Sequence, residues 1–97
     1  MKRTDRFLKR AWERGIPTLM ISKIECILLN NDNYKVSKNK TRLIIGKDMI
    51  KELGIESKSS ALVIIIKDGF LLITTFFIDN IWGYCESSNE EIETILM

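Results

Sequence analysis

The 97-residue sequence contains no histidine and only two cysteines, and these scarcities narrow the chemistry open to the chain. Without histidine, the usual general base of enzymes and the commonest metal ligand are both absent. The sequence also lacks glycine-rich phosphate loops, the GxSxG nucleophile motif and a paired-carboxylate pattern. We therefore expect that the protein is not an enzyme and that it holds neither a metal nor a cofactor.

The two cysteines, Cys26 and Cys85, are far apart and lack CxxC spacing. This arrangement excludes the common zinc patterns and gives no disulfide framework. We expect two buried thiols in a reducing cytoplasm, and a single bridge between them is the alternative.

Long uninterrupted apolar runs are scarce as well. The most apolar stretch, residues 61–78, is interrupted near its middle by Lys67-Asp68-Gly69. A bilayer penalises both charges, whereas a β-hairpin accommodates them at its turn. The N-terminus is too charged for a signal peptide. We therefore expect a cytoplasmic protein without a membrane span. The 45% hydrophobic content of the 97 residues is enough for one domain with a modest core.

Charge is distributed unevenly along the chain. Residues 1–51 hold 13 Lys and Arg against 5 Asp and Glu, a balance of +8, whereas residues 52–97 hold 2 against 8, a balance of −6. A chain divided in this way offers a basic surface to phosphate groups. The alternative is head-to-tail packing of oppositely charged subunits.

The N-terminal residues 4–14 predict a helix. Thr4 is a candidate N-cap, and Gly15 followed by Pro17 is a strong stop signal. The apolar side chains that share one face are Phe7, Leu8, Ala11 and Trp12. The basic side chains on the other side are Arg3, Arg6, Lys9, Arg10 and Arg14. This basic side is either a solvated face or an auxiliary phosphate contact, for which Arg3, Arg6, Lys9 and Arg10 are the candidates.

The sequence between residues 18 and 45 predicts extended structure. Residues 18–29 are rich in Ile, Leu and Met and predict a strand, followed by a turn at 30–33. Another strand begins at 34–37, and a turn follows at 38–40. The short segment 42–45 is almost entirely apolar after its first residue, which implies a strand buried on both faces.

The second half of the chain predicts one short helix and a hairpin. Residues 47–53 form the helix, and Gly54 follows at the expected C′ position. Strands at 62–66 and 70–76 flank Asp68-Gly69, a dipeptide that tolerates the positive φ angles of a type I′ turn.

The C-terminal residues 88–97 predict a short final helix. Ser88 and Glu91 have capping-box spacing. Its apolar stripe consists of Ile92, Ile95 and Leu96. This stripe packs either on the chain's own core or against a partner.

The strongest chemical signal is a cluster of cations around the predicted strands and turn at 34–45. Its members are Lys35, Lys38, Lys40, Arg42 and Lys47. In an extended backbone, side chains two residues apart share a face, so Lys38, Lys40 and Arg42 project together. Cations grouped in this way predict contact with the phosphates or base edges of nucleic acid. The alternative is a basic turn on a solvated surface.

Four motifs then follow one another: Arg42-Leu43-Ile44-Ile45, Lys47-Asp48, Leu53-Gly54-Ile55 and the hairpin at Asp68-Gly69. In this order they resemble the Arg-led strand, helix start, helix end and hairpin of the swapped-hairpin AbrB/MazE/SpoVT family. The resemblance covers about forty residues, from 36 to 75. One departure is Ile50, which stands where the family often has an arginine that contacts DNA.

The resemblance implies a mostly β chain with short helices (α+β). Two chains exchange hairpins to close an AbrB-like β-barrel dimer, with an added N-terminal helix and strand. The expected organisation is a basic extension at 1–33, the swapped-hairpin domain at 34–78 and an acidic tail at 79–97. The implied function is a DNA-binding transcriptional regulator that acts as a homodimer or higher homo-oligomer.

An alternative function is a protein-interaction module or an antitoxin-like protein that binds its partner through the C-terminal tail. The contact surface would then be Trp82, Tyr84 and the apolar stripe of the last helix. Binding of single-stranded nucleic acid by exposed aromatic residues is the weakest of the three hypotheses, because most aromatic residues lie in apolar runs.

Overall fold

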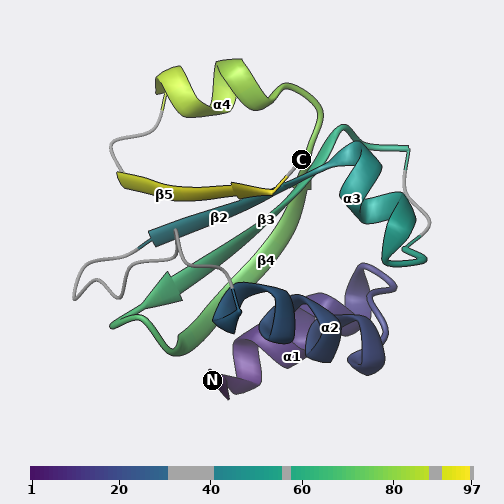
Figure 1. The fold of residues 1–97 in the computed structure, drawn as a ribbon, viewed down its shortest axis with the longest axis vertical. Coiled ribbons are helices and arrows are strands. Elements are labelled where there is room, and N and C mark those ends of the chain that lie inside the picture. The colour runs from purple at the N-terminus through teal and green to yellow at the C-terminus, as the bar shows by residue number, and fades with distance from the viewer. Residues whose placement is uncertain (31–40, 56–57, 88–90, 97) are drawn as a thin grey trace.

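The computed structural model describes residues 1–30, 41–55, 58–87 and 91–96, which form a small α+β domain built on a mixed sheet (Figure 1). The elements in chain order are β1 (Lys2–Arg3), α1 (Asp5–Glu13), α2 (Thr18–Leu29), β2 (Thr41–Gly46), α3 (Lys47–Glu52), β3 (Ala61–Lys67), β4 (Leu71–Ile78), α4 (Ile81–Ser87) and β5 (Glu91–Leu96). The strand order is β1-β4-β3-β2-β5. β3 pairs antiparallel with both β4 and β2, whereas β1 pairs in parallel with β4 and β5 pairs in parallel with β2 at the two ends of this order.

Helices cover both faces of the sheet. On β2, Leu43 and Ile45 contribute to an apolar cluster with α1, α2 and α3, while Ile44 faces a second cluster that includes residues of α4. Figure 1 shows α4 on the opposite side of the sheet from α1 and α2. All three of these strand residues are buried, which confirms the burial of β2 on both faces predicted from its apolar sequence.

The first helix forms as predicted and is tied to the sheet by its cap. The Thr4 hydroxyl accepts a hydrogen bond from the Phe7 amide (3.1 Å) and donates to the Leu72 carbonyl of β4 (2.8 Å). Phe7 and Ala11 are buried against the sheet. The predicted apolar face was too wide, because Leu8 and Trp12 are exposed to solvent.

Residues 18–29 form a helix, α2, and the predicted strand there is wrong. Ile21, Ile24 and Leu28 are buried, and their spacing of three and four places them on one helical face. Pro17 stands at the N-cap of this helix, a position where its missing amide removes no helical hydrogen bond. The apolar content of this segment is compatible with a strand or a helix, and packing against the rest of the domain favours the helix.

The C-terminal segment also differs from its prediction. Residues 91–96 form strand β5, which pairs in parallel with β2, instead of a final helix. The β-branched residues Ile92, Thr94 and Ile95 favour extended structure when a neighbouring strand offers a ladder. The capping-box residue Ser88 lies outside the described residues. Pairing with the edge of β2 determines the structure of this segment, although the capping-box spacing favours a helix.

The short helix and the hairpin are confirmed. Helix α3 ends before Gly54, whose φ of 77° lies in the left-handed region that favours glycine. Asp68 and Gly69 have φ angles of 57° and 78°, as both central residues of a type I′ turn require, and the Phe70 amide donates to the Lys67 carbonyl (3.3 Å). The second strand begins at Leu71, one residue later than predicted. The predicted strand start at 34–37 and the predicted turn at 38–40 lie outside the described residues.

Candidate anion-binding groove

The structure separates the cations predicted to contact DNA. Lys35, Lys38 and Lys40 lie outside the described residues. Lys47 is exposed at the first residue of α3. Arg42 is only 1% exposed, so its prediction as a DNA contact is corrected: the side chain lies inside the domain.

Strand geometry explains the burial of Arg42. It lies two residues before Ile44 and therefore shares the face of β2 that α4 covers. Its guanidinium carbon lies 4.9 Å from the ring centroid of Tyr84 in α4. That ring also meets Phe76 of β4 edge to face, with centroids 5.9 Å apart. Arg42 therefore joins β2 to α4, and desolvated cation–π contacts of this kind are worth about 2 kcal/mol.

Arg3, a predicted auxiliary phosphate contact, is engaged inside the chain. Its Nε donates to Oε1 of Glu25 at 2.6 Å, and its terminal nitrogen donates to the Ser22 hydroxyl at 3.0 Å. Both partners belong to α2, so Arg3 links β1 to that helix. This correction removes Arg3 from the candidate phosphate contacts.

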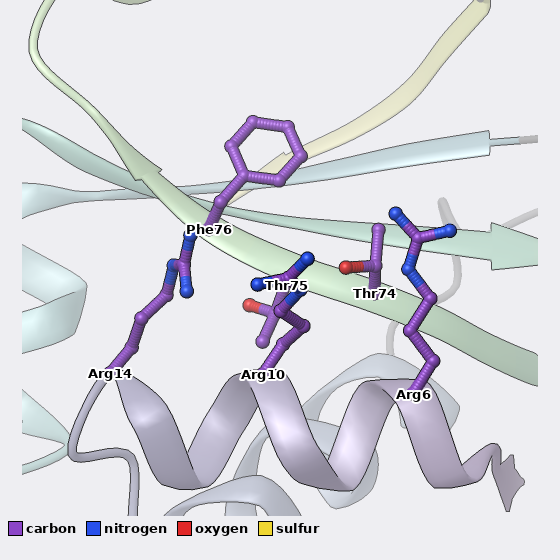
Figure 2. Close-up of a pocket in the computed structure, with 6 residues that line it drawn as sticks. All are labelled: Arg6, Arg10, Arg14, Thr74, Thr75 and Phe76. Atoms are coloured by element: carbon purple, nitrogen blue, oxygen red, sulfur yellow. The ribbon is translucent and has the colours of Figure 1, made fainter.

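Three other arginines form a row along α1. Arg6, Arg10 and Arg14 follow one another at intervals of four residues, from the first turn of α1 to its C-cap. Side chains at this spacing share a face and rise about 6 Å per step, so the row spans about 12 Å. Figure 2 shows the three side chains pointing from α1 toward β4.

The arginine row lines one side of a groove of about 250 Å³, and residues 74–76 of β4 line the other (Figure 2). Thr74 and Phe76 pair with residues of β3 that face the α4 cluster, whereas Thr75 pairs with Ile64 of the opposite cluster. Successive residues of a strand point to opposite faces of the sheet. Residues of both kinds can line the same groove only if the groove runs along the edge of the strand. The groove therefore lies along the outer edge of β4.

The groove lining is positively charged. Glu13 is the carboxylate that pairs with the row, at 3.1 Å from Arg10 Nη1 and 3.8 Å from Arg14 Nη1. Among the described residues, no carboxylate forms an ion pair with Arg6. Three guanidinium groups against one carboxylate leave a balance of +2, which attracts anions. Lys9 is exposed on α1 but does not line the groove.

The sequence pointed to part of this groove. Arg6 and Arg10 were candidate phosphate contacts, and the four-residue spacing that extends the row to Arg14 is readable from the sequence. Thr74, Thr75 and Phe76 carry no such signal, because only tertiary packing brings β4 beside α1.

Other candidate chemistry is limited in the described ranges. Their His, Cys, Asp and Glu side chains form no group of three that is arranged to hold a metal ion. Cys26 is a free, exposed thiol, so the prediction that it is buried is wrong. No helix in the same ranges has the length and apolar character needed to cross a membrane.

The arginine groove and the sheet edge beside it are features of this chain's own geometry. The chain matches no protein-family model, no curated protein and no solved structure.

Proposed function

We propose that this protein binds duplex DNA and acts as a transcriptional regulator. The observation that carries the proposal is the row of Arg6, Arg10 and Arg14 along one groove with a positive balance. Guanidinium groups bind phosphate oxygens through two parallel hydrogen bonds and remain charged at all physiological pH values. The regulatory role rests on the resemblance of residues 36–75 to the AbrB/MazE/SpoVT family.

The proposed contact surface differs from the one inferred from sequence alone. Arg6, Arg10 and Arg14 form its centre, and Lys9, exposed on the same helix but outside the groove, remains an auxiliary contact. Lys47, exposed on α3, remains a proposed contact, as do Lys35, Lys38 and Lys40 from the sequence pattern. Arg42 leaves the set because it is buried, and Arg3 leaves it because it is paired with Glu25 of α2.

The salt dependence of DNA affinity tests this surface. Each phosphate contact contributes about −0.9 to the slope of log K against log salt, so three contacts per chain contribute about −2.7. The double substitution Arg6→Gln and Arg10→Gln is expected to make the slope shallower by about 1.8. The measurement is fluorescence anisotropy of a labelled duplex between 50 and 200 mM salt.

The matched control is Lys23→Gln with Lys51→Gln, which removes two exposed cations from α2 and α3, outside the groove. This control should leave the slope closer to that of the unmodified protein. If both double variants change the slope equally, the charge is acting nonspecifically and the groove is not the contact. If the unmodified protein fails to bind duplex DNA at 50 mM salt, the proposed function is wrong.

We also propose that two chains associate, with exchange of the β3–β4 hairpin, as the family resemblance implies. Such a dimer would offer two arginine rows to one duplex, so the two proposals are compatible. Light scattering should then give a mass of at least twice the 11.3 kDa of one chain. A monomeric mass at micromolar concentrations would contradict the exchanged arrangement.

A further inference from the structure

Most of the outer edge of β4 has no partner strand within the described ranges. β1 pairs only with Leu71 and Leu72 of this strand. The last contacts come from Thr4, whose amide donates to the Leu72 carbonyl (3.1 Å) and whose hydroxyl reaches the Ile73 carbonyl (3.1 Å). The chain then turns into α1, so residues 74–78 present the backbone groups of an edge strand beside the groove.

The arginine row determines which strand this edge can accept. An unprotected edge invites pairing with a second copy of itself. Pairing of β4 with β4 of another copy would bring two arginine rows onto one seam, and like charges that face each other across strands are destabilising. The same row attracts carboxylates. Its charge therefore disfavours self-association at this edge and favours an acidic strand.

The spacing of the row fits an extended peptide. Side chains on one face of a strand recur about every 6.6–6.8 Å, and the arginines of α1 recur about every 6 Å. Three carboxylates at alternate positions of an extended peptide therefore span about 13 Å, which is close to the length of about 12 Å of the arginine row. Figure 2 shows α1 running alongside β4, so a strand added to β4 would follow the row instead of crossing it.

We propose that the β4 edge binds an extended acidic segment of a partner protein, which joins the sheet as an added strand. Its backbone pairs with residues 74–78, and carboxylates at alternate positions contact Arg6, Arg10 and Arg14. The intervening side chains lie on the opposite face, beside the half-buried Phe76 ring, which favours apolar residues there. This interaction goes beyond the proposed DNA binding and shares its arginines, so the two ligands compete.

The first experiment uses a fluorescein-labelled peptide of alternating glutamate and valine and the full-length protein at low salt. Two versions carry N-methyl groups on alternate amides, one version for each set of amides. Because an added strand directs only one set toward β4, one version should lose at least about tenfold in affinity while the other binds as before. Those amides of residues 74–78 that point away from β3 should also become protected from hydrogen exchange in NMR spectra, whereas the amides that already pair with β3 should change little.

Charge reversal provides the second experiment. The double substitution Arg6→Glu and Arg10→Glu should weaken the glutamate peptide about tenfold and strengthen a lysine–valine peptide of the same length. The double substitution Lys23→Gln and Lys51→Gln serves as the control and should change neither affinity in this way.

Two results would overturn the proposal. Equal binding of both N-methylated versions would show that the groove attracts charge without pairing to the strand. If the protein binds duplex DNA but not the glutamate peptide, the groove is a nucleic-acid site and not a site for an acidic strand, and the proposed function stands. Conversely, peptide binding without DNA binding supports this inference and removes the proposed function.

Discussion

Replacing Phe7 with alanine is expected to lower the free energy of unfolding by about 3–5 kcal/mol. Phe7 is 1% exposed and packs in the cluster that joins α1 to α2 and the sheet. The substitution removes an aromatic ring from a close-packed interior and leaves a cavity that the backbone fills only in part. A loss of this size is a large part of the 5–15 kcal/mol that stabilises a typical domain.

The neighbouring residue supplies the control. Leu8 lies on the same helix but is 41% exposed, so Leu8→Ala should change the free energy of unfolding by less than about 1 kcal/mol. Urea unfolding of both variants, followed by circular dichroism, gives the two values. Similar values for Phe7→Ala and Leu8→Ala would contradict the packing of α1 described above.

The second large effect is expected at Arg42. Arg42→Ala should lower the free energy of unfolding by about 2–4 kcal/mol, because it removes a buried aliphatic stem and the contact of the guanidinium with Tyr84. The DNA affinity of the folded protein should change little. Urea unfolding gives the stability, and anisotropy with a labelled duplex, at a temperature where the variant is folded, gives the affinity.

Lys47→Ala is the matched control, because Lys47 belongs to the same predicted cluster but is exposed. It should leave stability within about 0.5 kcal/mol of the unmodified protein and weaken DNA binding modestly. The reverse pattern, in which Arg42→Ala keeps its stability and loses DNA affinity tenfold, would restore Arg42 as a DNA contact and contradict its structural role.

Local signals in the sequence predicted the elements whose backbone requirements are strict. Asp68-Gly69 satisfies two positive φ angles, Gly54 a third, and the Thr4 side chain caps α1. Each of these features depends on a few adjacent residues, so it is readable without knowledge of the fold.

The wrong predictions concern segments whose structure depends on distant partners. Residues 18–29 are apolar enough for a strand or a helix, and their packing against α1 and the sheet decides between the two. Residues 91–96 carry a weak helical signal, but β2 offers them a ladder. Arg42 has the charge of a surface residue, and only the position of α4 over its strand face encloses it.

The candidate groove was half predictable for the same reason. The arginine spacing on α1 follows from the helix period, which is a local property. Within the described part of the chain, the edge of β4 is left without a partner strand beyond Leu72, because β1 is only two residues long and the chain then turns into α1. The sequence pattern does not reveal which strands are neighbours, so it could not show that β1 pairs with only the first residues of β4.

The position of Thr4 has a consequence for ligand binding. One hydroxyl both begins α1 and holds the carbonyls of Leu72 and Ile73, so the helix neither slides nor rotates along the strand without breaking these bonds. The register of the guanidinium groups along β4 is thereby set before any ligand arrives. Preorganisation of this kind reduces the entropy lost on association, so an incoming anion has only the mobile ends of the arginine side chains to order.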